Sequence, residues 1–460
     1  MTPWYQAPTT RQSIGGPWKV AVPAYAAVVA YLGLLVWAMN NWRYTTWVVL
    51  LIFPTLAITG ILILRWATID DPESMMGLLG AALVVKLAAS WVRFYVSFEL
   101  YGSGDSLQYH LDAVDRSNAF FDGRVSLTDL LTPRVGTKAI TDLTAMLYSL
   151  IGPARLGGFL VFSFVGFWGL FFFYKAFRVG LPEGDAVSYA KLVFFLPSLV
   201  FWPSSIGKEA VMMLAIGVSS FGAAKIARRI PGGWFTLVVG LAIGALVRPH
   251  VSAVILVAVT VAVLFRKPID DQAGFGAVGR FGGVLVLMIG LAFMFGQTAR
   301  YLVPESTKND AAVVSDVFEK ATAGTAGGGS EIDRPLPNSP FEYPSAAFTV
   351  LFRPTILEAS NAQNLAAAAE STILLVIIAR RWRRFREIPR LVFRRPYVLY
   401  AIVYTGVFCF AWSAFANLGA LARQRVQVWP LMLILLCLPT EPIAAPRRLS
   451  RDTDAAMTRP

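Results

Sequence analysis

The chain has 460 residues, of which 56% are hydrophobic and 15% are charged, and its mean hydropathy is +0.58. A soluble domain carries about 25% charged residues, so this composition excludes an ordinary soluble protein and predicts an all-α polytopic integral membrane protein. We interpret the net charge of +13 first as a sign of membrane topology, so no nucleic-acid partner is expected.

The predicted elements follow one another along nearly the whole chain. Residues 1–19 are polar, contain prolines and precede no small-residue cleavage site, which predicts a cytoplasmic N-terminus and an uncleaved first span. Apolar runs over 20–440 predict a membrane domain of about twelve transmembrane helices, followed by a cytoplasmic tail at 441–460. The runs lie near 20–39, 46–65, 76–97, 156–174, 190–203, 207–224, 234–247, 251–265, 281–299, 364–380, 397–416 and 427–440. The stretch 139–152 is short and rich in threonine, and we interpret it as one interfacial or re-entrant helix.

The distribution of basic residues predicts the orientation. They are concentrated in the segments on one side of the arrangement, most densely at 380–386. The positive-inside rule then places both termini in the cytoplasm of a multi-pass protein of the cytoplasmic membrane. Two long external loops result, at 98–155 and 300–363. The glycine-rich part of the second loop, 323–330, is either a lid over a site or a plain loop.

The first candidate site residue is an acidic one in the first long loop. Asp105 follows a glycine-containing turn and opens a helical pattern in which Tyr109 and Asp112 share its face, with His110 beside them. Asp105 is either an N-cap residue or a carboxylate that accepts a proton as general base. A divalent cation at Asp105 is the one cofactor that the sequence leaves open.

A charged pair opens the next informative span. Lys208 and Glu209 follow an apolar run that is short and interrupted by two prolines. Charges inside or at the edge of a bilayer are usually functional. Lys208 is a candidate ligand of a phosphate at a helix N-terminus. Glu209 is either a second candidate base or the partner that holds Lys208 in place, and both can also be a plain interfacial pair.

Further basic residues fall on the predicted external side. Arg248 and His250 flank Pro249 at the tip of a tight hairpin, and Arg423 and Arg425 precede the last span. Arginine binds phosphate or pyrophosphate in a bidentate manner, so we expect these four residues to contact the phosphate of a substrate. The alternative for the arginines near the last span is an ion pair with an external carboxylate.

The candidates for a supporting role are Tyr109, His110, Arg93, Arg353 and Glu358. Lys86 and Arg93 lie seven residues apart on one face of the third span, so both are expected to point into the bundle. Arg353 and Glu358 are close enough in sequence to pair with each other.

Several kinds of chemistry are unlikely on the sequence alone. The chain contains no P-loop, no dinucleotide-binding glycine motif, no HExxH and no CxxC, which argues against ATP hydrolysis, nicotinamide chemistry and zinc catalysis. Cys409 and Cys437 lie in apolar runs, so we interpret them as small buried hydrophobic residues. No metal site is predicted beyond the possible cation at Asp105.

Short strings in the chain resemble a group of known proteins. They are Phe195-Leu196-Pro197-Ser198, Phe201-Trp202, Gly207-Lys208-Glu209, Arg248-Pro249-His250, Phe352-Arg353-Pro354 with Glu358, and Arg423-Gln424-Arg425 with Pro430. The strings resemble poorly characterised multi-spanning bacterial proteins of polysaccharide assembly, chiefly actinobacterial. Those proteins are in turn similar to C-type glycosyltransferases and to O-antigen polymerases and ligases. The chain departs from the C-type pattern in that Asp105 follows the third predicted span, whereas the family's acidic residue follows the first.

The resemblance and the candidate residues together predict a function. We expect a membrane glycosyltransferase or glycan polymerase that moves a sugar or glycan from a polyprenyl-phosphate or diphosphate carrier to an acceptor hydroxyl at the outer face of the membrane. The expected partners are the lipid bilayer, the polyprenyl-linked donor and the glycan acceptor. The alternatives are a flippase or exporter of a lipid-linked glycan and a non-catalytic subunit of an assembly complex.

Overall fold

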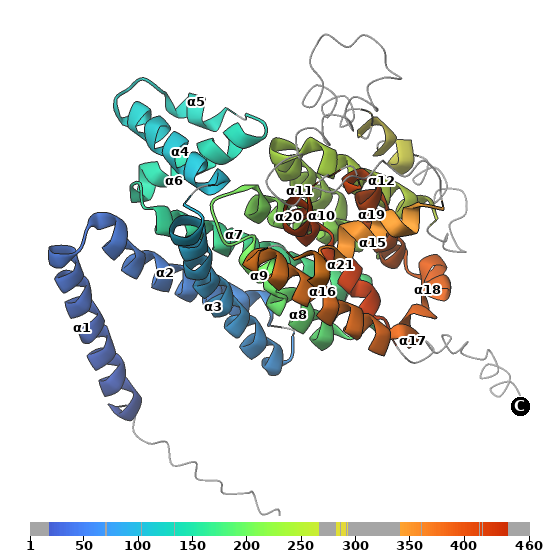
Figure 1. Cartoon of the computed structure of the whole chain (residues 1–460). Helices are drawn as coiled ribbons and strands as arrows, with labels where there is room; N and C mark the ends of the chain where they lie inside the picture. Colours follow the sequence, from blue (N-terminus) through green and yellow to red (C-terminus); the bar gives the residue numbers. More distant parts are fainter. Residues whose placement is uncertain are drawn as a thin grey trace, which may run out of the picture.

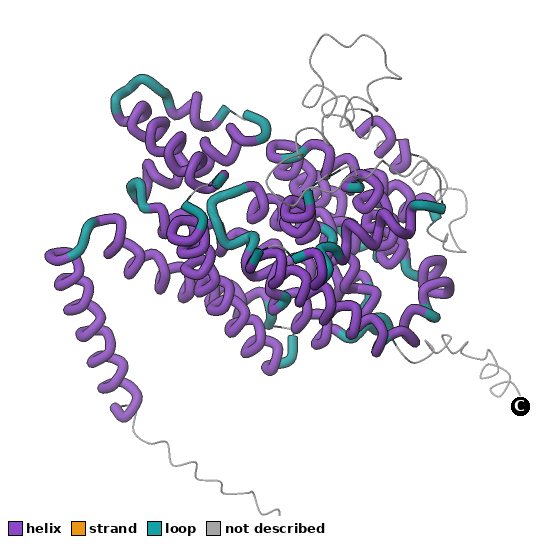
Figure 2. The backbone as a smooth tube through the Cα atoms, in the orientation of Figure 1, coloured by secondary structure: helices purple, strands orange, loops and turns teal. Residues whose placement is uncertain are grey.

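A computed structural model describes residues 18–265 and 341–439, except six single residues within those ranges, and short pieces of 282–292. In this part of the chain all regular elements are helical, and no strand is present (Figure 2). Within the described residues, six helices are long and apolar enough to cross a membrane, so the protein is a helical membrane protein. They are Val22–Asn41, Tyr44–Ala67, Met75–Leu100, Arg155–Gly180, Lys208–Ala227 and Ala362–Arg380.

The first helices lie at one edge of the molecule. Helix α1 (Trp18–Asn41) stands apart from the rest, and its apolar side chains are exposed almost throughout (Figure 1). Helix α2 (Tyr44–Ala67) packs on α3 (Glu73–Tyr95) and on α7 (Arg155–Gly180). Exposed apolar side chains on a helix of this length face lipid in a membrane protein.

The centre of the bundle is the packing of α7 against α10 (Lys208–Ala227). A Cβ atom added to Gly217 of α10 would lie 2.2 Å from the carbonyl oxygen of Gly169 of α7, so these two helices touch through their backbones. Helix α11 (Gly233–Val247) approaches the other side of α10 in the same way, because Gly240 lies against the backbone of Ser219. Small residues at helix crossings are the usual means of close packing in membranes. The packing fixes the position of the N-terminus of α10.

The predicted crossing at 190–203 is two short helices, α8 (Ala186–Phe195) and α9 (Pro197–Phe201). Pro197 disfavours a helical conformation at the residue before it, and the chain bends there. Pro203 has no amide hydrogen, so it cannot bond to the carbonyl of Leu199, four residues earlier. The ammonium group of Lys86 on α3 donates to that carbonyl at 2.8 Å and to the Val200 carbonyl at 2.9 Å. The fully buried lysine therefore holds the broken segment in place.

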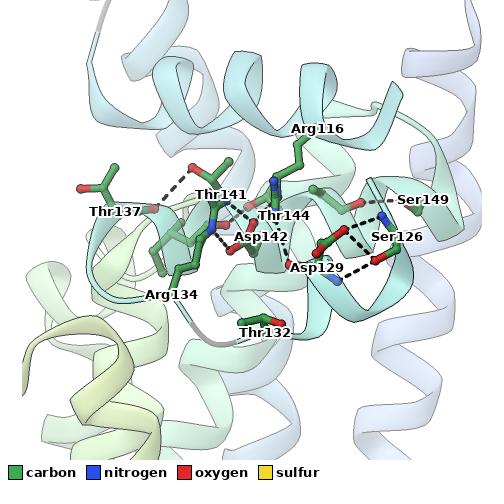
Figure 3. A network of polar contacts seen from close by, with 12 residues as sticks. Arg116, Ser126, Asp129, Thr132, Arg134, Thr137, Thr141, Asp142, Thr144 and Ser149 are labelled. Atoms are coloured by element: carbon green, nitrogen blue, oxygen red, sulfur yellow. Dashed lines mark hydrogen bonds and ion pairs between the residues drawn. The ribbon is translucent and has the colours of Figure 1, made fainter. Parts of the chain in front are cut away.

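The predicted external loop 98–155 contains a helical unit of three helices. A π-helical turn, η1 (Val96–Leu100), continues α3, and it is followed by α4 (Asp105–Phe121), α5 (Leu127–Leu131) and α6 (Thr137–Ile151). Buried Asp142 of α6 forms ion pairs with both Arg116 and Arg134, and a capping box of Ser126 begins α5 (Figure 3). The backbone amide of Gly136 donates to the Leu246 carbonyl, which ties the unit to the end of α11.

Helix α6 falls on the stretch 139–152, for which we expected a helix that does not cross the membrane. It has 15 residues, is shorter than a membrane span and packs its buried face on α4.

The C-terminal part consists of α16 (Ala362–Arg380) and several shorter helices. They include α12 (Pro249–Leu264), α15 (Tyr343–Phe352), α17 (Trp382–Phe385), α18 (Ile388–Arg394), α19 (Pro396–Trp412), α20 (Leu418–Gln424) and α21 (Trp429–Ile434). The predicted crossing at 427–440 is a series of short turns: η4 (Arg425–Gln427), α21 and η5 (Leu435–Cys437). Both cysteines are buried and free, as the sequence predicted.

Some predictions fall outside the described residues. These are nearly all of the cytoplasmic N-terminus at 1–19, most of the crossing at 281–299, the external loop 300–363 up to residue 340 with its glycine-rich segment 323–330, and the cytoplasmic tail at 441–460.

Candidate functional site

Buried Glu209 is the centre of a charged cluster in which four separate elements meet. Its side chain is 2% exposed and lies in the first turn of α10. Arg423 of α20 donates from Nε to Oε1 at 2.9 Å and from Nη2 to Oε2 at 3.0 Å. Arg248, between α11 and α12, donates from Nη2 to Oε1 at 3.2 Å. Both carboxylate oxygens are therefore occupied by guanidinium groups in a bidentate arrangement.

Asp105 is the second carboxylate of the cluster, and its surroundings differ. Its Oδ2 accepts from Nη1 of Arg423 at 2.8 Å, and its side chain is 57% exposed. One guanidinium group thus joins an exposed carboxylate at the start of α4 to a buried one at the start of α10. Burial lowers the pKa of Arg423, but the nearby charges of Glu209 and Asp105 outweigh it, and the net shift is upward. Arg423 is a permanent cation in this position.

Two glutamines fix the orientation of Arg248. Nη1 of Arg248 donates to Oε1 of Gln424 at 2.6 Å, and Nε2 of Gln427 donates to the same oxygen at 2.6 Å. Gln424 lies between the two predicted arginines in the sequence, yet it was not among the predicted site residues. The sequence did not identify Gln424 because candidate site residues were recognised as charged residues among apolar ones, and glutamine is neutral.

Two further cations are near the cluster and have no acidic partner within ion-pair distance among the described residues. Lys208 precedes Glu209, and its ammonium group interacts electrostatically with Arg248, Glu209 and Asp105. Arg93, in α3, interacts electrostatically with Arg423, Glu209 and Asp105. Its Nε is buried without a hydrogen-bond partner in the described part of the chain. Four cations therefore surround two carboxylates, and the cluster carries excess positive charge that fits an anion.

Two aromatic groups from the predicted set border the cluster. Tyr109 is buried one turn after Asp105, and burial, with the charges of Asp105 and Glu209, raises its pKa to about 12. The ring of His250 lies 5.5 Å from the ring of Trp412, and its Nδ1 has no hydrogen-bond partner among the described residues. The charged groups that interact with the His250 ring are Arg248 and Lys208, so the ring lies next to the cations of the cluster.

Arg425 is placed away from the cluster, although it lies only two residues after Arg423. It is fully buried and donates to the carbonyls of Leu351, Arg353 and Ala367 and to the hydroxyl of Ser371, at 2.9 to 3.3 Å. Residues two apart on a helix point in nearly opposite directions, so Arg425 faces away from the side of the helix that carries Arg423. Its contacts are those of a residue that joins helices.

The other predicted support residues form local pairs. Arg353 pairs with Glu358, which also accepts from Thr355 in a capping box. His110 lies with Nδ1 2.7 Å from the Tyr148 hydroxyl. Neither pair contacts the cluster around Glu209.

An apolar pocket of about 310 Å³ lies beside Arg93. Phe201 and Trp202 line it, and the guanidinium carbon of Arg93 lies 4.8 Å from each of their ring centroids. Glu370 of α16 is also part of the lining, and it accepts hydrogen bonds from the amide and hydroxyl of Ser198 at 3.1 and 2.8 Å. The sequence contained no signal for this pocket, because apolar and aromatic residues are frequent throughout the chain.

The residues around Asp105 do not form a ligand set for a metal ion. Among the described residues, no three His, Cys, Asp or Glu side chains come together. Arg423 joins Asp105 to Glu209, and both oxygens of the Glu209 carboxylate accept from arginines. A divalent cation prefers several oxygen ligands, and here the positive charge beside Asp105 is a guanidinium group.

Comparison with known proteins gives no relative. No protein-family model, no curated protein and no solved structure matches this chain.

Proposed function

We propose that this protein is a membrane glycosyltransferase or glycan polymerase that uses a polyprenyl-phosphate or diphosphate donor at the outer face of the cytoplasmic membrane. One observation carries the proposal: four cations surround two carboxylates at one end of a membrane helix bundle, next to an apolar pocket. A phosphate that is esterified to a lipid has both of the required parts, an anion for the cluster and a hydrocarbon chain for the membrane.

The two carboxylates have different roles in this proposal. Asp105 is exposed and has a single arginine contact, so it is the general base. Glu209 is buried and fully occupied, so it holds Arg423 and Arg248 in position. Asp105 takes the proton of the acceptor hydroxyl as the hydroxyl oxygen attacks the anomeric carbon. The bond from that carbon to the phosphate oxygen breaks, and its electron pair leaves with the phosphate.

The cations stabilise the phosphate as it leaves. Negative charge builds up on the phosphate as it leaves, and it is stabilised by the positive charges of Arg93, Lys208, Arg248 and Arg423. His250 lies beside these cations. Removing one preorganised donor from such a site costs about 3 to 4 kcal/mol of transition-state stabilisation. A low-dielectric position at the membrane boundary increases this effect.

The test compares two aspartates of the same helix. Asp105→Asn removes the base, while Asp115→Asn neutralises an exposed aspartate of α4 that has no hydrogen-bond or ion-pair partner among the described residues. Purified protein is incubated with a polyprenyl-phosphate-linked sugar and an acceptor glycan. We expect elongation by the wild type and by Asp115→Asn, and a loss of at least a hundredfold in Asp105→Asn.

Three outcomes would contradict the proposal in different ways. Equal activity of the two variants removes Asp105 as the base. If the protein moves the lipid-linked sugar across the membrane of vesicles without elongating the acceptor glycan, it is a flippase or exporter. If all substitutions at the cluster leave glycan synthesis in cells unchanged, the protein is a non-catalytic subunit.

A further inference from the structure

The apolar pocket beside Arg93 is built by three separate parts of the fold. Leu100 and Tyr101 come from the π-helical end of the α3 span, Phe201 and Trp202 from the end of α9, and Ala366 and Ala367 from the first half of α16. Figure 1 shows α9 and α16 side by side near the middle of the bundle, in agreement with their contacts. The pocket is at the lower end of the size range for ligand sites, roughly 300 to 1,000 Å³.

One side of the pocket is continuous with the surface of the membrane helices. Leu100 is 62% exposed, and Leu365 of α16, beside the pocket-lining Ala366, is 51% exposed. Both belong to helices that are long and apolar enough to cross a membrane. Exposed leucines on such helices face hydrocarbon, so a lipid chain can extend from the pocket into the bilayer.

The charged side chains in the pocket lining, Glu370 and Arg425, pair with each other at 3.9 Å, and the unpaired charge near the pocket, among the described residues, is Arg93, behind the rings of Phe201 and Trp202. Phe201 and Trp202 line the pocket and also contact the guanidinium group of Arg93 with their rings. The Nε of Arg93 is buried without an acceptor, and no carboxylate lies within 4.0 Å of its guanidinium group in the described part of the chain. An arginine in a membrane helix is normally paired, so this one is suited to an anion that binds from outside the chain.

We infer that the pocket holds the first part of a single hydrocarbon chain of a prenyl phosphate, with the phosphate ester at Arg93. This inference rests on the proposed function and identifies the part of the fold that recognises the lipid. The carrier chain enters between η1 and α16, contacts Phe201 and Trp202, and ends where the guanidinium group contacts the same two rings. The phosphate then lies on the side of Arg93 that interacts electrostatically with Asp105, Glu209 and Arg423.

The size and charge of the pocket select among lipids. A pocket of about 310 Å³ suits one chain, whereas a phospholipid has two. A neutral prenol leaves Arg93 without an anion, and inorganic phosphate leaves the apolar walls empty. Both parts of the ligand are therefore needed for tight binding.

The experiment measures binding of radiolabelled farnesyl phosphate to the full-length protein in phosphatidylcholine nanodiscs, with no acceptor present. Ala366→Trp fills the pocket, and Ala369→Trp places the same side chain on an exposed position of α16 that does not line it. We expect Ala366→Trp to weaken binding at least tenfold and Ala369→Trp to leave it unchanged. Ala366→Leu, a smaller change, is used for the same comparison if Ala366→Trp does not fold.

The charge is tested separately. Arg93→Gln is expected to weaken farnesyl phosphate binding at least tenfold and to leave the weaker binding of farnesol unchanged. Equal binding by the Ala366 variants and the wild type, or equal affinity of the wild type for farnesol and farnesyl phosphate, would overturn the inference. Competition by dioleoyl phosphatidic acid at the same concentration as farnesyl phosphate would identify a general phospholipid site and would also overturn it.

The same measurements separate this inference from the proposed function. Binding that depends on Ala366 and Arg93 without any glycosyl transfer by the wild type would uphold the lipid site and reject the enzyme. Transfer that depends on Asp105 but is insensitive to Ala366→Trp would uphold the enzyme and reject the pocket.

Discussion

Arg423 and Arg425 illustrate at the scale of single residues how much depends on the direction of a side chain. The sequence offered both as phosphate ligands because both are arginines on the same side of the predicted membrane domain. The structure places Arg423 between two carboxylates and Arg425 among backbone carbonyls of α15 and α16. The sequence placed Asp105, Lys208, Glu209, Arg248, Arg423 and Arg425 on one side of the predicted membrane domain, but it did not take into account that residues two apart on a helix point in opposite directions.

These positions predict different effects of mutation. Arg425→Leu leaves the carbonyls of Leu351, Arg353 and Ala367 without their donor, so we expect a large loss of folded protein, since each unsatisfied buried group costs about 1 to 3 kcal/mol. Arg423→Lys keeps the charge but cannot form the bidentate contact, so we expect normal protein levels with little glycosyl transfer. Size-exclusion chromatography of both variants and the elongation assay measure the two effects. Arg124→Ala, which removes an exposed ion pair with Asp122, is the control.

His110 predicts a dependence of stability on pH. Burial, with a smaller contribution from Arg155, lowers the pKa of His110 to about 4. The histidine pKa in an unfolded chain is about 6.5, so between these values the unfolded state binds a proton that the folded state does not. Stability should therefore fall as pH decreases from about 6.5 to about 4. The thermal unfolding of the wild type in detergent is compared with that of His110→Gln across this range, and parallel curves for the two would contradict the prediction.

At the scale of elements, long apolar runs were predicted correctly where one helix carries the whole run. The runs at 46–65, 76–97, 156–174, 207–224 and 364–380 each correspond to a long helix. The run at 190–203 is also apolar but contains two prolines, and it forms two helices of 10 and 5 residues. Hydrophobicity alone does not distinguish these cases, because the break depends on a missing amide hydrogen and on a lysine in another helix.

The contact of α7 with α10 predicts which glycine can be replaced. Gly217→Val places a side chain where the backbone of Gly169 already lies, so we expect the variant to lose folded protein and glycosyl transfer. Gly80→Val makes the same change in α3, where no atom lies within 4 Å of an added Cβ, so we expect little effect. Both variants replace glycine by valine within a helix, so the change in helix propensity is the same. A difference in the yield of monodisperse protein between them therefore measures the effect of packing. Similar yields would contradict the close approach as the reason for these glycines.

At the scale of the whole molecule, the charged cluster and the basic segment of α17 and α18 lie at opposite ends of the bundle. Helix α16 begins beside the pocket at Ala362 and ends at Arg380, and a helix of this length extends about 30 Å. Beyond it, Arg384 pairs with Asp185 and Arg395 with Glu183. The sequence predicted this separation from the positive-inside rule, and the orientation relative to the cell stays a prediction.

Cysteine labelling tests the orientation. Arg124→Cys lies in the helical unit of α4 to α6, and Arg390→Cys lies on α18; both positions are exposed. The native cysteines are buried, so they give little background. We expect a membrane-impermeant maleimide to label Arg124→Cys on intact cells and Arg390→Cys only after permeabilisation. The reverse pattern would place the cluster in the cytoplasm and would reject an extracytoplasmic reaction.

The pairing of Lys86 with the segment before Pro203 has a consequence for evolution. Because residue 203 is a proline, the Leu199 carbonyl lacks its usual backbone donor. The ammonium group of Lys86, 113 positions before Leu199, donates to this carbonyl instead. The two positions should therefore vary together among related chains. A homologue that regains an amide hydrogen at 203 can replace the lysine with an apolar residue, whereas one that keeps the proline should also keep a donor at 86.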